Sequence, residues 1–574
     1  MQVQLPEGRT VVPIILSSDS TQLTSFTGKH SCYPVYLTIG NIAKHARRAP
    51  SMRAQRLVGY LPVGKLDKSF SARRSREART RLYHDSMRLI CQSLFVPARD
   101  GIRLADSQGA VRLCHTVLAS YIADYPEQCL VTCTRYGQAC PICFSKKKSF
   151  GRNEHGELRD QSLTWATIDA FFSADSRDSR KTTLDELNIE GLNPVDQPFW
   201  LDWSFANVHA AMTSDVLHQL VQGMGKHLVQ WLIALADPKE LDARVQRLPL
   251  AHNLRRFKQG ITGLANISGG EHKAIYAQII GCVHGLAPDA AVQAASALLD
   301  FLYVAQYECH STHTLHDLRT ALSEFHELKH VFEQQGVRSG VFRAKALVES
   351  FLTFLTDFDL PKLHALQHYV HSIERLGTTD NYNTEATERQ HIDQAKRAFA
   401  ASNKRDFIAQ MCRWLERREA VFWFATYLEW RVGGTFVSGL QKPCTKPRAT
   451  LHHEAVQVSL RPDHRHVTLQ QLDIDYGVPG FKTVLSSFLR KWHHIRTYRG
   501  YEPKLPYDVT KALKILGSVG TWNLAKFRTP NLQTLAAPDL ISKVYASPMT
   551  GRFDTVLVQT KHQEDAGATG LDGA

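Results

Sequence analysis

The clearest pattern in the sequence is a run of apolar residues that ends in an acid. Residues 11–16 (Val-Val-Pro-Ile-Ile-Leu) are followed by two serines and then by Asp19. A second apolar stretch, residues 117–123, ends in the same way at Asp124. Short continuous apolar runs are typical of strands buried on both faces of a sheet. The sequence therefore predicts two buried strands, each with a carboxylate at its C-terminal end, where many α/β enzymes hold a metal ion.

The order of the predicted elements around these acids indicates an α/β core. Three strands are expected at Val11–Ser17, Val35–Ile39 and Arg56–Leu61. A helix follows, with apolar residues at helical spacing from Tyr83 to Phe95, and then the strand that leads to Asp124. Three strands, a helix and a further strand that ends in an acid match the order of an RNase H-like core.

A third acid is predicted on a helix that begins near Thr384. Acidic and apolar residues recur there at spacings of three and four, which predicts one packing face: Glu385, Glu388, Ile392, Ala395 and Phe399. Glu385 follows a favourable N-cap and has an ordinary role as a first-turn acid near the positive end of the helix dipole. Glu388 has no such role. We therefore take Glu388 as the third acid and keep Glu385 as the alternative.

The chain between the second and third acids is predicted to be largely helical. Apolar positions follow a helical period from about residue 206 to residue 375. The longest apolar-rich stretch, residues 290–307, is interrupted by Gln293 and Asp300, so we expect a buried helix and no membrane span. Residues 173–186 are rich in Ser, Asp and Arg, which predicts a flexible linker.

Six parts are therefore expected along the chain. They are the first part of an RNase H-like core (1–128), a zinc loop (129–160), a linker with an all-helical insertion (161–375), the core helix with the catalytic glutamate (376–430), a mixed C-terminal region (431–563) and a disordered tail rich in Gly and Ala (564–574).

Four cysteines follow Asp124 in the pattern C-x₃-C-x₆-C-x₂-C: Cys129, Cys133, Cys140 and Cys143. Four thiolates within fifteen residues suit tetrahedral Zn²⁺ in a structural site. Cys140 and Cys143 form the firmest pair. Cys129 also fits a buried position in the core, in which case His155 or His209 would be the fourth ligand. The alternative is four unmetallated core cysteines, because free Cys is commonly buried.

Several long motifs resemble one family in content and in order. They are residues 19–24 (DSTQLT), 33–42 (YPVYLTIGNI), 123–128 (ADYPEQ), 215–220 (DVLHQL), 377–385 (GTTDNYNTE) and 388–393 (ERQHID). The series resembles Plavaka-type transposases, which belong to the KDZ group of fungal elements and are distantly similar to CACTA transposases. The likeness spans residues 5–430. Several long motifs in the right order are far more specific than one short pattern.

The resemblance implies a DDE transposase with an RNase H-like catalytic region. Asp19, Asp124 and Glu388 would hold two Mg²⁺ or Mn²⁺ ions about 4 Å apart, with Asp19 as the bridging ligand. The Glu388–Arg389 pair is similar to the pair that carries the acid in CACTA-like enzymes. The implied activity is hydrolysis of a phosphodiester at a transposon end, followed by joining of the freed 3′-hydroxyl to target DNA.

Asp215 and His218 form a further motif between the second and third acids. They are three residues apart and therefore neighbours on one helical face. They resemble the C/D-x-x-H motif of several eukaryotic cut-and-paste transposases, which implies an accessory role in organising the site or the transposon end. The alternative is that Asp215 is a helix-start acid and His218 an ordinary surface histidine.

Charge favours a polyanionic partner. The net charge is +14 and the sequence pI about 9.2. Two basic segments are expected to contact nucleic acid, and their basic residues include Arg73, Arg74 and Arg76 in the first and Arg490, Lys491 and Arg496 in the second. A packed amphipathic helix is the alternative for the second segment. Cysteines scattered through apolar segments are typical of a reduced compartment, and no secretory signal is expected. We expect a protein that acts on DNA in the nucleus. A homo-oligomer is compatible with this expectation.

A catalytically inactive or host-adapted DNA-binding relic of a transposase is the second interpretation. The sequence begins almost at the first predicted catalytic strand, so the upstream region that would recognise terminal repeats is expected to be missing from a shortened copy. Intact Asp19, Asp124 and a helix glutamate favour the enzyme, since a relic has no chemical need for all three.

A zinc metalloprotease is the third interpretation. His326, Glu327 and His330 match the pattern H-E-x-x-H, in which two histidines hold zinc and the glutamate acts as a base. The chain contains 27 histidines, so chance matches are expected, and no third histidine ligand follows. Glu324, His326, Lys329 and His330 predict instead a solvated, charged helix face.

Overall fold

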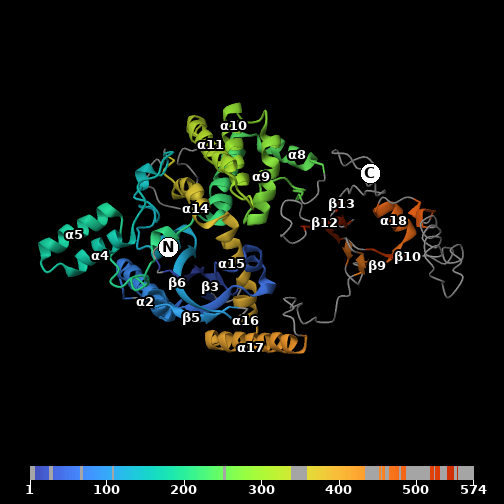
Figure 1. The fold of residues 1–574 in the computed structure, drawn as a ribbon. Coiled ribbons are helices and arrows are strands. Elements are labelled where there is room, and N and C mark those ends of the chain that lie inside the picture. Colours follow the sequence, from blue (N-terminus) through green and yellow to red (C-terminus); the bar gives the residue numbers. More distant parts are fainter. Residues whose placement is uncertain are drawn as a thin grey trace. The chain divides into compact units, whose positions relative to one another are not determined.

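The computed structural model divides the chain into two units, residues 1–245 with 259–440 and residues 246–258 with 441–574. The residues that it describes are 5, 7–24, 30–64, 69–106, 109–249, 254–337, 358–433, 451–453, 456–458, 464–476, 480–481, 483–485, 518–521, 524–529, 540–547 and 552–553. The predicted tail at 564–574 lies outside these residues. The first unit contains the predicted core and is shown with labelled elements in Figure 1.

A mixed sheet lies at the centre of the first unit (Figure 1). Its strands in the described part of the chain are β1 (Arg9–Ser18), β2 (Thr21–Gln22), β3 (Ser31–Ile39), β4 (Arg56–Leu61), β5 (Ile102–Ala105) and β6 (Val111–Ile122). The order across the sheet is β2-β3-β1-β6-β5, and β4 also pairs with β3. β3 is antiparallel to β1 and β4, whereas β6 is parallel to β1.

The parallel pair of β1 and β6 places the two predicted acid positions at one edge of the sheet. Ser17 lies opposite Ile122 in the register, so Asp19 and Asp124 both follow directly beyond this end of the pair. Between β4 and β5 comes helix α2 (Ala72–Arg99), which packs on the sheet through Met87 and other buried residues. The predicted succession of strands, helix and strand is confirmed, and the fold is mixed α/β.

The main hydrophobic core joins this sheet to the segment that follows the cysteine-rich loop. Leu16 of β1 and Leu118 of β6 belong to the same cluster as Trp200 and Trp203. The indole N–H of Trp200 donates to the carbonyl of Val131 at 2.8 Å, so burial of this side chain leaves no unpaired donor. Large aromatic side chains with satisfied polar atoms contribute strongly to such cores.

The regular elements of the described chain between the second and third predicted acids are helices. They are α3 (Tyr125–Val131), η3 (Lys147–Ser149), α4 (Gln161–Ser173), α5 (Arg177–Glu190), α6 (Val208–Ala211), η4 (Val216–Gly225), α7 (Lys226–Leu235), α8 (Pro238–Arg247), α9 (Gly269–Val283), α10 (Asp289–Val304), α11 (Thr312–Leu328), α12 (Val331–Gln334), α13 (Pro361–Ala365), η5 (Leu366–His368), α14 (Tyr369–Leu376) and η6 (Thr379–Asn381). Two short helices, α1 (Lys44–Arg48) and η2 (Pro50–Met52), precede β4. The predicted helical character is confirmed for these residues.

The apolar stretch near residue 300 is the buried helix α10, as predicted. Nine of its residues are buried, among them Leu298 and Phe301. No helix in the described part of the chain combines the length and the apolar character that crossing a bilayer requires.

The predicted flexible linker at 173–186 is wrong, because most of it is helix α5. Ser176 caps this helix by accepting the N–H of Ser179, and Gly191 ends it in the left-handed conformation (φ 70°). Leu187 is fully buried in the main core, and α5 packs beside α4. This segment is thus a helix despite its polar composition, because it is capped at both ends and buries Leu187.

The predicted face of the glutamate helix also differs from the structure. The helix is divided into α15 (Thr384–His391), a π-helical turn η7 (Ile392–Lys396) and α16 (Arg397–Ala400), and α17 (Phe407–Gly433) follows. A π-turn shifts the register of the residues on either side of it. Ile392 is consequently 38% exposed, while Thr387, His391 and Ala395 are buried in its place. Glu385 and Glu388 therefore lie beside the packing face and not at its centre.

The second unit has a mixed character in its described residues. Five strands form an antiparallel sheet in the order β13-β12-β11-β8-β7, and β9 pairs with β10. Their bounds are β7 (Leu451–His453), β8 (Val456–Val458), β9 (His464–Thr468), β10 (Ser518–Thr521), β11 (Leu524–Thr529), β12 (Leu540–Ser547) and β13 (Arg552–Phe553). Helix α18 (Leu469–Asp475) begins with a capping box between Thr468 and Gln471.

Truncation of the buried residue of α5 tests whether this segment is an ordered helix. We expect Leu187→Ala to destabilise the α4–α5 pair by about 2–4 kcal/mol, because it removes a fully buried side chain. Trypsin should then cleave faster at Arg177, Arg180 and Lys181. Ile189→Ala is the matched control, since Ile189 is 60% exposed on the same helix. Rapid cleavage of the wild type at these sites would contradict an ordered α5.

Candidate active site and metal centre

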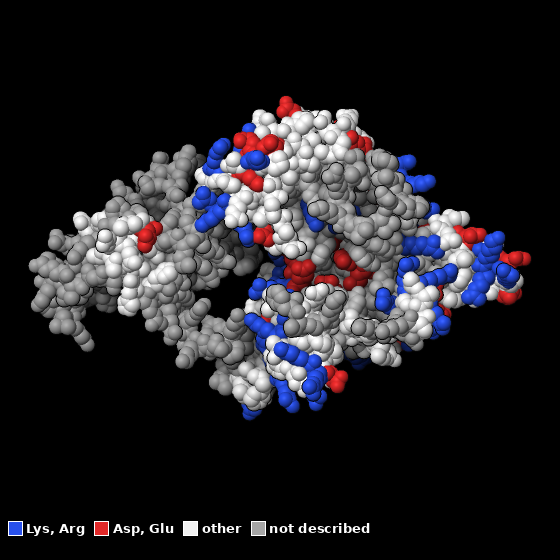
Figure 2. All heavy atoms as spheres, turned by 180° about the vertical axis from the view of Figure 1, so that it is seen from behind, with Lys and Arg blue, Asp and Glu red and all other residues white. Residues whose placement is uncertain are grey.

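Acidic side chains gather in a recess on one face of the molecule, with Lys and Arg on the surface around it (Figure 2). Asp19 follows β1 directly, and Asp124 follows β6 after one residue. Asp124 is also the N-cap of α3, since its Oδ1 accepts the N–H of Glu127 at 3.0 Å. Asp124 therefore caps a helix and also lies at the carboxyl end of a central strand.

The predicted acids act on one another electrostatically. Burial and the negative charges of Asp124 and Glu388 together raise the pKa of Asp19 to about 6, whereas the charge of His218 lowers it. Burial likewise raises the pKa of Asp124, while the N–H of Glu127 and the charge of His218 lower it. The structure therefore brings Asp19, Asp124 and Glu388 into one electrostatic environment, although 264 residues of sequence separate the last two.

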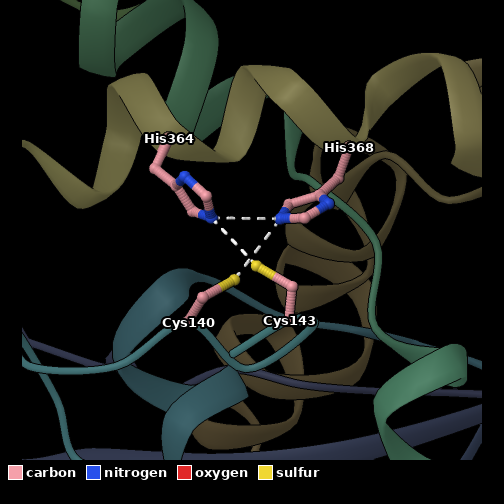
Figure 3. Close-up of side chains that lie close together, drawn as sticks. All are labelled: Cys140, Cys143, His364 and His368. Carbon is pink, nitrogen blue, oxygen red and sulfur yellow. Dashed lines mark hydrogen bonds between the residues drawn. The ribbon is translucent and has the colours of Figure 1, made fainter. Parts of the chain in front are cut away.

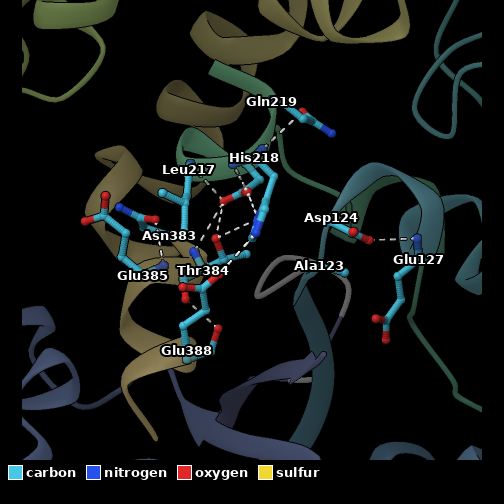
Figure 4. Close-up of polar contacts among 12 residues, drawn as sticks. Ala123, Asp124, Glu127, Leu217, His218, Gln219, Asn383, Thr384, Glu385 and Glu388 are labelled. Atoms are coloured by element: carbon cyan, nitrogen blue, oxygen red, sulfur yellow. Dashed lines mark hydrogen bonds and ion pairs between the residues drawn. The ribbon is translucent and has the colours of Figure 1, made fainter. Parts of the chain in front are cut away.

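His218 connects two acids across the recess. Its Nδ1 lies 2.7 Å from Oδ2 of Asp215, and its Nε2 lies 3.1 Å from Oε1 of Glu388 (Figure 4). Burial would lower the pKa of His218, but the hydrogen bonds and charges of Asp215 and Glu388 outweigh burial and raise it to about 10. His218 is therefore a cation at neutral pH and orients the carboxylate of Glu388.

Asp215 ties two helices together beneath this histidine. It caps η4, a π-helix, by accepting the N–H groups of Leu217 and His218. Its Oδ1 also accepts the hydroxyl of Thr384 at 2.7 Å, at the start of α15. Asp215 is thus a helix-start acid, as the alternative proposed, but it is 1% exposed and holds the helix of Glu388 as well. The alternative of an ordinary surface histidine at His218 is wrong.

Glu385 faces a different partner from Glu388. Its Oε1 lies 2.6 Å from Nζ of Lys273 on α9. Figure 4 shows its side chain directed away from His218, on the other side of α15 from Glu388. Of the two glutamates left open by the sequence, Glu388 is therefore the one that faces Asp19.

A second group of side chains joins the cysteine-rich loop to α13 and η5 (Figure 3). The donor atoms of Cys140, Cys143, His364 and His368 all lie within 4.8 Å of one another, and all four residues are buried. Cys143 Sγ lies 3.2 Å from Nε2 of His364, and Cys140 Sγ lies 3.4 Å from Nε2 of His368. Two thiols and two imidazoles in this arrangement suit tetrahedral Zn²⁺. The group could therefore bind zinc.

The surroundings of these thiols favour ionisation of Cys143 and disfavour ionisation of Cys140. The N–H of Ile142 donates to Sγ of Cys140, and the N–H of Ser145 donates to Sγ of Cys143. A hydrogen bond from Cys140 lowers the pKa of Cys143, with help from the two histidines, whereas burial raises the pKa of Cys140. Arg159 holds the loop, since its Nε donates to the carbonyls of Cys140 and Cys143 at 2.9 and 3.0 Å.

The predicted zinc ligands are corrected at two of four positions. Cys129 lies on α3, hydrogen-bonds Thr134 and Tyr125, and has its pKa raised to about 12 by burial. Cys133 adopts a positive φ of 59° and faces His84, with Sγ 3.7 Å from Nε2. Both thiols are therefore buried with other partners, and neither belongs to the donor group of the loop.

The two alternative histidine ligands also have other partners. His155 packs its ring against that of His368 at a centroid distance of 5.4 Å. His209 is occupied at both nitrogens, by the carbonyl of Pro141 and the hydroxyl of Thr164. The two histidines of the donor group, His364 and His368, have the spacing H-x₃-H, which complements C-x₂-C in many zinc sites. The sequence carried this signal, but 221 residues separate Cys143 from His364.

The H-E-x-x-H segment does not form a metal site in the described chain. Helix α11 ends at Leu328, between His326 and His330, and the two histidines have different partners. His326 is buried against Lys329, with Nδ1 2.6 Å from Nζ, while His330 pairs with Glu333 at 2.8 Å. Burial lowers the pKa of Lys329 to about 8. The predicted solvated face is thus wrong for His326 and Lys329.

Basic residues of the first predicted nucleic-acid segment lie on the exposed start of α2. Arg73, Arg74 and Arg76 are all exposed, and the buried positions of this helix begin only at Tyr83. Arg73 forms an ion pair with Glu77 one turn away. The second segment, with Arg490, Lys491 and Arg496, lies outside the described residues.

The part of the chain that contains the sheet, Asp19 and Asp124 matches a known protein family. Residues 1–232 match the family model of Plavaka transposase. This match confirms the resemblance and covers Asp19, Asp124, Asp215 and His218, whereas Glu388 lies beyond it. No curated protein matches the chain. The family match indicates transposase function, and with it a DNA-processing enzyme that binds DNA.

Removal of one zinc ligand is expected to release the metal. Cys143→Ser or His368→Gln should lower the zinc content of the purified full-length chain from one ion towards none, because three donors bind Zn²⁺ less tightly than four. The melting temperature should fall with it, since metal binding contributes to folding. Elemental analysis and thermal unfolding measure the two effects.

Cys129→Ser is the matched control for the metal centre. This thiol is buried in the same region but lies outside the donor group, so the variant should keep its zinc. Loss of zinc from Cys129→Ser, with zinc retained in His368→Gln, would contradict the Cys₂His₂ assignment.

The raised pKa of Asp19 predicts how stability depends on pH in protein free of Mg²⁺ and Mn²⁺. A pKa above the ordinary value of 3.8 means that folding disfavours the charged carboxylate, so wild type loses stability as pH rises through about 6. Asp19→Asn should therefore raise the free energy of unfolding by about 1–3 kcal/mol at pH 7.5, and by less at pH 4.5. Denaturant unfolding at both pH values measures this, with Asp169→Asn, an exposed change on α4, as the control. An equal gain at both pH values would contradict the predicted shift.

Proposed function

We propose that this chain carries the catalytic region of a DDE transposase with an RNase H-like core. It would use Mg²⁺ or Mn²⁺ to hydrolyse phosphodiesters at DNA ends and to transfer the freed 3′-end to target DNA. The observation that carries the proposal is the meeting of Asp19, Asp124 and Glu388 in one electrostatic environment. These are the acids that the sequence motifs single out.

The topology of the sheet supports this proposal. Three antiparallel strands in the order β4-β3-β1 are followed by α2 and then by β6, which pairs in parallel with β1. This is the succession expected of an RNase H-like core. The carboxyl ends of parallel strands are also where α/β folds bind ligands.

The donor set of the recess fits a hard divalent cation. Carboxylate oxygens are the ligands that Mg²⁺ and Mn²⁺ prefer, and few protein ligands suffice because these ions keep several waters. The raised pKa of Asp19 is consistent with a cation site, since mutual repulsion of the acids is relieved by positive charge. When bound, two such ions would activate the attacking oxygen and stabilise the leaving oxygen.

The roles of the residues follow from their positions. Asp19 interacts electrostatically with both Asp124 and Glu388, as a bridging ligand would. His218, held by Asp215, would orient Glu388 towards the recess. Lys362 lies within electrostatic range of Asp124 and could contact a phosphate oxygen there.

The exposed start of α2 is the proposed first contact with DNA. Arginines on one exposed stretch of helix can contact successive phosphates. Such contacts weaken as the salt concentration rises, because the release of counterions from DNA is then less favourable. Action in the nucleus and assembly into a homo-oligomer belong to this proposal as well. A relic that binds DNA without cleaving it is the competing interpretation, and the experiment below separates the two.

Substitution of the three acids tests the chemistry. With Mg²⁺ or Mn²⁺, the wild type should nick or join DNA, and Asp19→Asn, Asp124→Asn and Glu388→Gln should each abolish this activity. Their DNA affinity should be equal or higher, because each change removes a negative charge that repels the phosphate backbone. Nicking of supercoiled plasmid and DNA binding at fixed salt measure the two properties.

Glu385→Gln is the matched control, since Glu385 lies on the same helix but pairs with Lys273. It should retain most of the activity, and so should Glu327→Gln in the H-E-x-x-H segment. DNA binding by the wild type without metal-dependent cleavage would support the relic. Cleavage of a protein substrate that is lost in Glu327→Gln would overturn the transposase proposal.

A further inference from the structure

Glu127 contacts both of the strand ends that carry the proposed catalytic aspartates. Its backbone N–H donates to Oδ1 of Asp124 at 3.0 Å. Its side-chain Oε1 accepts the hydroxyl of Ser18, the last residue of β1 and the neighbour of Asp19. One residue on α3 therefore links the ends of β1 and β6 directly. Sequence reasoning did not select it, although it lies inside one of the family-like motifs.

The side chain of Glu127 departs from the role that its position predicts. Asp124 and Glu127 fit the capping-box pattern, in which the glutamate at the third helical position bonds back to the backbone of the cap residue. In α3 the aspartate accepts the N–H of Glu127, but the carboxyl group of Glu127 is directed at Ser18 instead. The residue thus gives up a local hydrogen bond for one that reaches a different strand.

A buried set of hydroxyl groups fixes this contact. Tyr33 also hydrogen-bonds the carboxyl group of Glu127. Ser18 Oγ lies 2.5 Å from the hydroxyl of Tyr121, which in turn lies 2.7 Å from the hydroxyl of Tyr83. Unpaired polar groups are costly in a buried environment, so a satisfied network of this kind holds its members in one geometry.

We infer that Glu127 is a positioning residue that sets the distance between Asp19 and Asp124 and thereby the affinity of the recess for a divalent cation. The inference rests on the proposed function, because the cation is the one that the three acids would hold. Partners of this kind, which touch metal ligands but not the metal, typically change metal affinity by about 10- to 100-fold.

The placement of Glu127 is consistent with positioning and not with direct ligation. Its Oε1 accepts the hydroxyl of Ser18, and the side chain is buried. Glutamine has the same shape and keeps an oxygen that can accept this hydroxyl, so Glu127→Gln should preserve the contact.

Binding of Mn²⁺ to the full-length, zinc-loaded protein, followed by electron paramagnetic resonance, tests the inference without relying on DNA cleavage. Glu127→Ala and Ser18→Ala break the bridge from its two ends, and each should weaken Mn²⁺ binding by about 10- to 100-fold. Glu127→Gln should bind Mn²⁺ about as tightly as the wild type. Tyr83→Phe is the matched control: it removes a hydroxyl from the outer end of the network and should lower the melting temperature without changing Mn²⁺ affinity.

The outcomes separate this inference from the proposed function. Wild type that binds no Mn²⁺, or Asp19→Asn that binds it as tightly as wild type, would overturn the proposed function and this inference with it. Loss of binding in Asp19→Asn, with unchanged affinity in Ser18→Ala and in folded Glu127→Ala, would overturn the inference alone. Should Glu127→Ala fail to fold, Ser18→Ala decides, because it removes one hydroxyl group and no charge. Equal weakening in Tyr83→Phe would likewise overturn a specific positioning role.

Discussion

Repulsion among carboxylates is the constraint on which the rest of the candidate site depends. Burial, together with the charges of Asp124 and Glu388, raises the cost of ionising Asp19 at the end of a central parallel strand pair. His218 offsets part of this cost, since Asp215 and Glu388 together raise its pKa to about 10 and so keep it charged. Without these acids His218 would be neutral, because burial alone lowers its pKa. Its charge therefore depends on both acids, and removal of Asp215 would free both His218 and the start of α15.

Two π-helical segments position the side chains that the acids need. His218 lies in η4, and η7 begins four residues after Glu388. Such segments are uncommon and occur often at functional sites, because they shift the faces of a helix relative to a regular α-helix. Across α15 and η7, His391 and Ala395 are buried while Ile392 is exposed. Glu388 is thereby left at the edge of the packing face, where its carboxylate can reach both His218 and the recess.

The sequence predicted those features that depend on local pattern. The apolar runs before Asp19 and Asp124, the helix between them and the helical character of residues 206–375 all follow from periodicity, and each is confirmed in the described residues. The errors come from contacts that span long separations or from helices with polar composition. His364 and His368 lie more than 200 residues from the cysteines that they join. Residues 177–190 form a helix because of their caps and Leu187, which composition does not reveal. The role of Glu127 depends on a contact with Ser18 of another strand, which its local pattern does not reveal.

The same long-range contacts attach the later part of the first unit to the part that matches the family. Residues 1–232 contain the sheet, the cysteine pair and Asp215, whereas Glu388 and both zinc-type histidines come from later in the chain. Thr384 is held by Asp215, and His364 and His368 are held by Cys143 and Cys140. These two contacts lie close together along the later chain, on either side of α14. A metal at the Cys₂His₂ group would therefore hold the chain before α14, while Asp215 holds the chain after it, at the start of α15. The placement of Glu388 thus depends on both attachments, and loss of either should move the third acid away from the first two.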